Sequence, residues 1–335
     1  MRLSSQELIN AVVVNKGKAD NRLAAKAVIS TMTDQDIVEL MREQSAAELF
    51  SVIDVTGFGM YHSPQNLRDG HVLPLEPLME RFGNVDNYNS VPLILGTNRD
   101  ENKVFMAQDP EYISHWFGVI PRIKDKARYN HFAAYSSDQW KALSVDEPAL
   151  LLSETQGDVY AYRFDWDEAP STWLVDFPTL LGAGHGLEVS YVFGDFIGGI
   201  SIPYLLSEEN EAGRLALSAS MMNYWGEFAR SGAPGQGSDG EQVPWTAWNN
   251  TGNKILLLDT QAGGGIRMSD TLITAQSLKQ RLQADPLIAS QHDLCRWYAN
   301  LFINSYQSTD FWQQGEYDNL GEGGCKQYDP YQFEE

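Results

Sequence analysis

The chain has 335 residues, of which 43% are hydrophobic and 11% aromatic, a composition typical of a globular protein with a substantial core and not of a disordered chain. Its 45 acidic and 24 basic residues give a formal net charge of −21, which argues against nucleic acid and against an anionic membrane as partners. No apolar stretch approaches the ~20 residues that span a bilayer, and the N-terminal residues lack the apolar core of a signal peptide.

The first predicted helices lie near the N-terminus. Ile37, Leu40 and Met41 form an apolar stripe at helical spacing. Ser45 and Glu48 then make an S-x-x-E capping box, which predicts that another helix begins at this point.

The first predicted strand is the apolar run Val91–Gly96, and an acidic loop follows it. A continuous apolar run is typical of a parallel strand that is buried on both faces. The loop carries two neighbouring carboxylates, Asp100 and Glu101, either of which could point inward. Because catalytic groups gather on loops at strand ends, both are candidate active-site residues.

Two further runs predict strands. Val159–Trp166 is rich in aromatic residues and carries a charge at Arg163, which favours either a position nearer an edge of the sheet or a strand that emerges from the core. Ile255–Leu258 is short and wholly apolar. Long helical segments separate the three runs, which indicates crossover connections. The sequence therefore predicts the α/β class, with a mostly parallel sheet flanked by helices.

A histidine between two glycines, His185, is the candidate proton acceptor. By itself this pattern fits an ordinary loop or capping histidine as well as a catalytic one. Glu188 follows three positions later, either as a buried carboxylate near an active site or as a solvated side chain. The other histidines occur in no comparable context, and we assign them no role: His62, His71, His115, His131 and His292.

Two long helices are predicted in the second half of the chain. The first is capped by Ser207 and ends at Gly232. Its expected core face consists of Leu217, Met221, Met222, Trp225 and Phe228. The second helix has an apolar stripe that must pack against another element, made of Leu294, Trp297, Tyr298, Leu301 and Phe302.

Cys295 and Cys325 are the two cysteines of the chain. The absence of a CxxC motif argues against a structural zinc site. Two interpretations remain open: a disulfide if the protein is exported, or two unrelated thiols if it is cytoplasmic.

Five segments together resemble the type B carboxylesterases and cholinesterases of the α/β-hydrolase fold. They are RDGHVLP from Arg68, TNRDEN from Thr97, HGLEVSYVFG from His185, MMNYWGEFARSGAPG from Met221 and VPWTAWNNTGNKILLLD from Val243. Their order and rough spacing agree with the family, so the resemblance extends from about Ser45 to Asp259.

The resemblance implies a carboxylic ester hydrolase with a Ser-His-Glu triad and no cofactor. Glu101 matches the triad acid and His185 the base, which leaves Asp100 a structural role. No G-x-S-x-G motif occurs in the chain, and the family's glycine-rich oxyanion loop and serine elbow precede all the matched segments. The nearest serines to inspect as substitutes are Ser190 and Ser201.

We therefore expect the C-terminal portion of an α/β-hydrolase, which lacks the N-terminal strands and the nucleophile elbow and is inactive alone. Residues 1–315 would be part of a single domain, and residues 316–335 an acidic tail that is either mobile or strapped across the surface. The cellular location stays open, with export an option if the native N-terminus lies upstream.

The expected substrate is a small-molecule carboxylic ester. Phe105, Met106, Trp116 and Phe117 are candidates for lining its pocket, with core packing as the alternative use. A sheet cut beside its central strand exposes unpaired backbone groups, so we also expect a complementary N-terminal polypeptide, self-association or aggregation. Two alternatives to the enzyme are a cholinesterase-like interaction module that has lost catalysis and an inactive truncated fragment.

Overall fold

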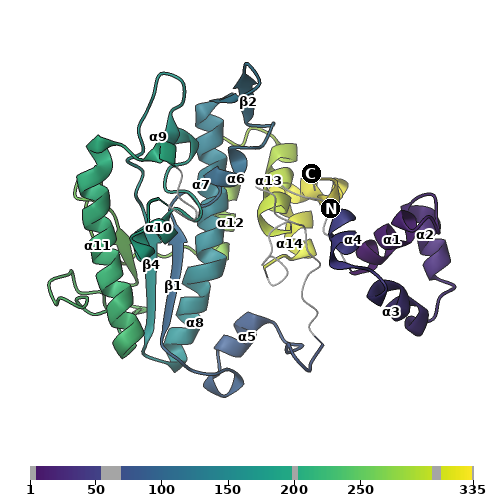
Figure 1. Ribbon diagram of the computed structural model, residues 1–335, viewed down its shortest axis with the longest axis horizontal. Helices are drawn as coiled ribbons and strands as arrows, with labels where there is room; N and C mark the ends of the chain where they lie inside the picture. The colour runs from purple at the N-terminus through teal and green to yellow at the C-terminus, as the bar shows by residue number, and fades with distance from the viewer. Residues whose placement is uncertain (1–4, 54–68, 198–202, 304–310, 334–335) are drawn as a thin grey trace. The chain divides into compact units, whose positions relative to one another are not determined.

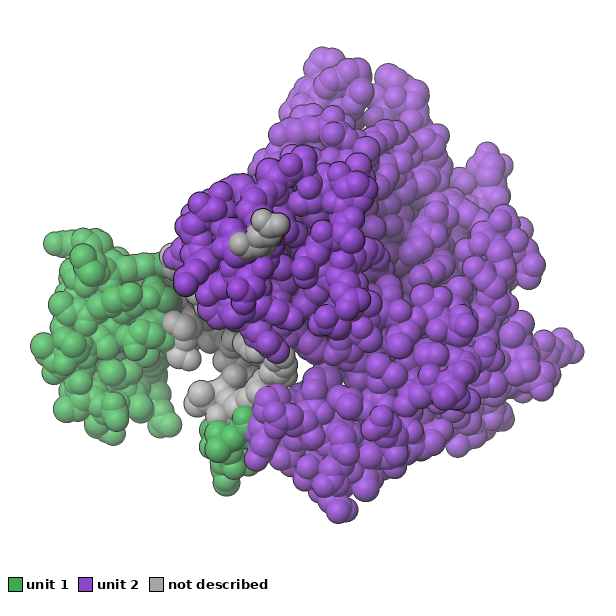
Figure 2. All heavy atoms as spheres, turned by 180° about the vertical axis from the view of Figure 1, so that it is seen from behind, with its two compact units in different colours: residues 1–75, 335 green, residues 76–334 purple. Residues whose placement is uncertain are grey.

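The computed structural model describes residues 5–53, 69–197, 203–303 and 311–333. His62, Arg68 and Ser201, which were named from the sequence, lie outside the described residues. The chain forms two compact units, residues 1–75 with 335 and residues 76–334 (Figure 2). We describe each unit by itself.

The first unit is helical. It contains α1 (Ser5–Asn15), α2 (Arg22–Ile29), α3 (Asp34–Arg42) and α4 (Ala46–Ser51) (Figure 1). The predicted capping box is confirmed: the Ser45 side chain accepts a hydrogen bond from the Glu48 amide, and the Glu48 carboxylate accepts one from the Ser45 amide. An apolar cluster of this unit contains the buried residues Val12, Val13, Ala25, Ile29 and Leu40.

The second unit is built on a mostly parallel sheet, as predicted. Its strands are β1 (Leu93–Asn98), β4 (Val159–Phe164), β5 (Ile255–Leu258) and β6 (Arg267–Ser269), in the order β1-β4-β5-β6. The first three strands are parallel and β6 is antiparallel to β5. A separate antiparallel hairpin consists of β2 (Ile113–Trp116) and β3 (Ile120–Ile123).

One expectation about the strands was wrong, and the strand order decides another that was left open. The first strand begins at Leu93 and not at Val91, and its residues up to Gly96 are half-buried because β1 is the last strand in the described sheet order. β4 lies between β1 and β5, so of the two positions expected for this strand the edge position is excluded. Its charged residue is tolerated there because the Arg163 guanidinium pairs with Asp165, at 2.6 Å from Nε to Oδ1.

The buried apolar residues around this sheet form two clusters, and helices cover both faces of the sheet (Figure 1). Tyr160 and Tyr162 face α11, where they meet the rings of Phe228 and Trp225. Val159 and Ala161 point to the other face and join the apolar cluster of α8. The period-two alternation of a strand therefore divides β4 between two layers of helices.

The helices of this unit have the following bounds: α5 Leu78–Phe82, α6 Lys103–Met106, α7 Lys126–Lys141, α8 Glu147–Thr155, α9 Phe177–Leu180, α10 Glu188–Phe193, α11 Glu208–Ser231, α12 Ala275–Ala284, α13 Gln291–Phe302, α14 Gln314–Asp318 and α15 Leu320–Gly323. A π-helical turn, Ala142–Asp146, joins α7 to α8. Pro148 follows this turn and lacks the amide that would bond to Ser144, which explains the local change of hydrogen-bond register. No helix among the described residues is long and apolar enough to cross a membrane.

The long helix α11 has the predicted ends. Ser207 caps its N-terminus and Gly232, with φ +82°, caps its C-terminus. Leu217 and Met221 are buried as expected, but Met222 is exposed, so it does not belong to the core face. The expected face was therefore too wide by one residue.

The C-terminal helices form a second apolar core around α13. Cys295 and Cys325 form a disulfide with a Cα–Cα distance of 5.5 Å. Tyr317, Leu320 and Phe333 are buried in the same cluster as the α13 residues. The segment that we expected to begin a tail at residue 316 thus packs inside this unit, whose boundary lies at residues 75 and 76.

Candidate active site

The acid loop begins where β1 ends, and its geometry follows from the last two strand residues. Thr97 and Asn98 are both buried. The Asn98 amide donates to Glu101 Oε1 at 2.7 Å, and the Thr97 hydroxyl donates to the same oxygen at 3.2 Å. The Glu101 side chain is therefore folded back onto the strand end and buried, with Oε2 left for another partner.

That partner is His185. Its Nδ1 lies 2.7 Å from Glu101 Oε2, so the structure brings together the two residues that the sequence singled out. The histidine side chain is 45% exposed, whereas the glutamate is nearly covered. Among the described residues, Glu101 is the side chain that hydrogen-bonds to the histidine ring, which leaves Nε2 as the atom able to accept a proton.

The pKa of His185 is raised above its ordinary value. The main cause is the hydrogen bond with Glu101, while burial of the ring acts in the opposite direction. The negative charges of Glu101 and Glu188 add to the increase. The site thus favours the imidazolium that forms when the ring accepts a proton.

The loop that carries His185 needs its glycines. Gly182 and Gly186 have φ values of +51° and +80°, a region that favours glycine. A Cβ at Gly182 would lie 2.4 Å from Asp100 Oδ2, and one at Gly184 would lie 2.6 Å from Val104 Cγ2. The glycines therefore let the histidine loop approach the acid loop closely.

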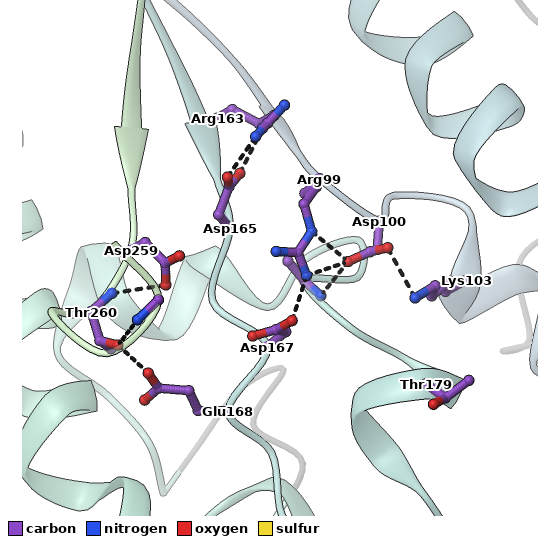
Figure 3. A network of polar contacts seen from close by, with 12 residues as sticks. Arg99, Asp100, Lys103, Arg163, Asp165, Asp167, Glu168, Thr179, Asp259 and Thr260 are labelled. Atoms are coloured by element: carbon purple, nitrogen blue, oxygen red, sulfur yellow. Dashed lines mark hydrogen bonds and ion pairs between the residues drawn. The ribbon is translucent and has the colours of Figure 1, made fainter. Parts of the chain in front are cut away.

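Asp100 connects these two loops and does not contact the histidine ring. Its amide donates to the Ala183 carbonyl at 3.0 Å, and its carboxylate accepts from the Ala183 amide at 3.1 Å. Arg99 and Lys103 both pair with the same carboxylate (Figure 3). Burial alone would raise the pKa of Asp100, but the two neighbouring cations lower it.

Asn98 was not singled out as a site residue from the sequence. Its side-chain amide donates to the Gly184 carbonyl at 2.8 Å and also to the Glu188 carboxylate. Glu188 is thus placed against the acid loop, and burial raises its pKa. The available signal was an asparagine at the end of a predicted strand, which does not specify a partner 86 positions away.

Two aromatic rings flank His185. The ring centroids of Trp140 and Phe105 lie 5.0 Å and 5.4 Å from that of the imidazole. Of the other candidate pocket residues, Met106 is buried in the core, and Trp116 and Phe117 are exposed on the hairpin. No pattern in the sequence selected Trp140, because it lies on a helix that is remote from both loops along the chain.

Two further points from the sequence concern a substitute serine and a metal site. Ser190 is buried in α10. In the part of the chain that the structure describes, no three His, Cys, Asp or Glu side chains gather as metal ligands would.

Comparison with known proteins identifies what this chain is similar to. The carboxylesterase family profile matches residues 111–277. Acetylcholinesterase 1 of Caenorhabditis elegans is 27% identical over 179 residues, which cover 49% of this chain and 27% of that protein. Para-nitrobenzyl esterase of Bacillus subtilis (strain 168) is 23% identical over 77% of this chain and 49% of its own length.

The fold also agrees with a solved structure. The crystal structure of EstA from Aspergillus niger has a TM-score of 0.52 at 16% identity, with 89% of this chain and 55% of that chain covered, and supports an α/β-hydrolase-like fold. The chain spans about half or less of the length of the relatives it matches. Residues 111–277 thus match the carboxylesterase family, and the chain is similar to esterases and cholinesterases of that family.

Proposed function

We propose that this chain supplies the acid and the base of a Ser-His-Glu carboxylic ester hydrolase, with Glu101 as the acid and His185 as the base. The observation that carries the proposal is the 2.7 Å contact between Glu101 Oε2 and His185 Nδ1. The family match supports ester bonds as the target of this pair.

In the proposed reaction, Nε2 of His185 accepts the proton of an attacking serine hydroxyl. The ring later returns this proton to the leaving alcohol. Glu101 fixes the tautomer with the proton on Nδ1 and stabilises the imidazolium, because its carboxylate is held in place from behind by Thr97 and Asn98. Asp100 keeps the histidine loop in register with the acid loop.

We further propose that the serine and the oxyanion hole come from outside this sequence, on a complementary polypeptide that extends the sheet at β1. Two observations support this. β1 is the last strand in the described sheet order, and its apolar residues Leu93–Gly96 are only half-buried. An incomplete parallel sheet of this kind is expected to pair with another strand or with a second copy of the chain.

The test is to purify the chain alone and together with the polypeptide encoded immediately upstream, and to assay both with p-nitrophenyl butyrate. We expect no turnover by the chain alone and turnover by the complex. His185→Ala should abolish that turnover, whereas the matched control His115→Ala, on the exposed hairpin, should retain it.

Other outcomes would contradict parts of this proposal. Turnover by the chain alone that His185→Ala abolishes would place the nucleophile on this chain. Turnover by the complex that survives His185→Ala would remove the proposed base. A stable complex without turnover would favour the catalytically inactive interaction module.

A further inference from the structure

The hairpin of β2 and β3 presents apolar side chains at its tip. Trp116 is 50% exposed, Phe117 91% and Val119 74%. The turn is closed by a hydrogen bond from the Val119 amide to the Trp116 carbonyl at 3.1 Å. Internal packing of this unit therefore does not explain why large apolar residues occupy these positions.

The backbone of the turn makes this choice more unusual. Phe117 and Gly118 have φ values of +52° and +75°, the combination of a type I′ turn, in which asparagine and glycine are preferred. Among the described residues, Phe117 is the only non-glycine residue with a positive φ. A strained phenylalanine weakens the hairpin, and its ring contacts that of Trp116, which is itself exposed, so the fold of this unit does not account for it.

The charges near the tip indicate which kind of surface its apolar side chains would contact. Residues 113–128 contain four basic residues and one acidic residue, in a chain with 24 basic and 45 acidic residues. Two of these cations are already paired: Lys126 with Asp176 and Arg128 with Glu111. The other two are exposed close to the tip, with the Arg122 guanidinium 4.0 Å from the centre of the Trp116 ring and Lys124 bonded to a backbone carbonyl.

We propose that this tip docks on the surface of a phospholipid bilayer that contains anionic lipids. Trp116, Phe117 and Val119 enter the interfacial layer, and Arg122 and Lys124 contact the headgroup phosphates. The net charge of −21 does not prevent this, because salt screens charges that lie more than about 8–10 Å from the surface. The ion pair of Lys126 with Asp176 also ties the base of the hairpin to the loop of Trp173, a second highly exposed aromatic residue.

Vesicle flotation of the full chain tests the proposal. We use vesicles of phosphatidylcholine and phosphatidylglycerol at a ratio of about 4:1, and we expect the wild-type chain to float with them. Phe117→Gly removes the apolar side chain and fits the positive φ, so the hairpin is retained while binding falls at least ~10-fold. Phe193→Ala is the matched control. Phe193 is 74% exposed, but an acidic residue, Asp195, lies two positions after it, so this variant should bind as the wild type does.

A charge reversal separates the two contributions. Arg122→Glu combined with Lys124→Glu should reduce flotation with the anionic vesicles and have a smaller effect with pure phosphatidylcholine. Failure of the wild type to float, or equal flotation of wild type and Phe117→Gly, would overturn the proposal. A wild-type oligomer that Phe117→Gly dissociates in lipid-free sedimentation, without a change in flotation, would show that the tip binds protein instead.

Discussion

Two loops that are close along the chain differ in almost every physical respect. The acid loop after β1 places buried polar side chains against one another, and Glu101, Asn98 and Asp100 each bond to another part of this unit. The tip of the β2–β3 hairpin exposes apolar side chains and contains a phenylalanine in a backbone region that disfavours it.

This difference in contacts and exposure indicates whether a residue acts within the chain or toward a partner. Internal hydrogen bonds and ion pairs account for the residues of the acid loop, which hold a proton acceptor in one orientation. The described contacts of the hairpin tip are mainly among its own residues and with Arg122, and Phe117 costs stability through its positive φ. The contacts of the acid loop therefore position Glu101 against His185 within this chain, whereas the side chains of the hairpin tip are exposed to partners outside it.

The largest expected effect tests the acid loop through its chemistry. In the complex with the complementary polypeptide, Glu101→Gln should lower kcat by about 10⁴-fold, as removal of the orienting acid does in a serine protease triad. Glu154→Gln, on the exposed side of α8, is the matched control and should leave kcat unchanged.

The same substitution can be tested without turnover. The hydrogen bond that His185 Nδ1 donates to Glu101 is the main cause of the raised pKa of His185, and burial opposes it. Glu101→Gln should therefore lower the pKa of His185, which an NMR titration of the chain alone would measure. An unchanged pKa would show that the contact between the two side chains does not persist in solution.

The next effect concerns Asp100, which links the acid loop to the loop that carries His185. Asp100→Asn leaves Arg99 and Lys103 without the carboxylate that lies between them, and the Lys103 side chain is only 9% exposed. We expect the free energy of unfolding to fall by about 3 kcal/mol, measured by urea denaturation. Asp167→Asn removes the more exposed partner of Arg99 and should cost at most about 1 kcal/mol. Equal effects of the two substitutions would mean that Asp100 has no special position.

Much of the fold could be predicted because its signals are local. The helix caps at Ser45, Ser207 and Gly232 and the strand Ile255–Leu258 depend on residues that adjoin one another in sequence, and all of them are observed. The order of the strands depends on pairing between distant segments, which is why the position of β4 was left open between an edge of the sheet and its core. The burial of Tyr317 and Phe333 likewise arises from packing on α13, and composition alone suggested a tail.

The candidate site was predictable to a similar extent. The motifs selected Glu101 and His185, and the structure places them in contact, while their catalytic roles stay predictions. Asn98 and Trp140 were missed because their relation to the histidine is created only when β1, α7 and the histidine loop are brought together. The strain at Phe117 could not be inferred either, since a phenylalanine next to a glycine does not by itself specify a positive φ.

A smaller effect is expected at the end of β5, where a carboxylate is buried among others of its kind. Burial, together with Asp165 and Asp167, raises the pKa of Asp259 from 3.8 to about 6. A raised folded-state pKa means that this group favours folding below about pH 4 and that this contribution is lost as the pH rises through 6. Asp259→Asn should therefore increase stability by about 1–2 kcal/mol at pH 8 and hardly change it at pH 4. Thermal unfolding at the two pH values checks this, and an equal effect at both would exclude a titration as its cause.

The smallest effect is expected at the hairpin tip. Unlike the substitutions in the acid loop, the one that removes the proposed binding side chain should make the fold more stable. Phe117→Gly relieves the strain of a positive φ and should raise the free energy of unfolding by about 1 kcal/mol, less the greater backbone freedom of glycine in the unfolded chain. Phe117→Ala removes the same ring but keeps a Cβ in the strained region, so it should give no such gain. Urea denaturation of both variants therefore separates the strain from the side chain. If alanine and glycine stabilise equally, the positive φ carries no cost, and the hairpin tip loses the feature that sets it apart from the acid loop.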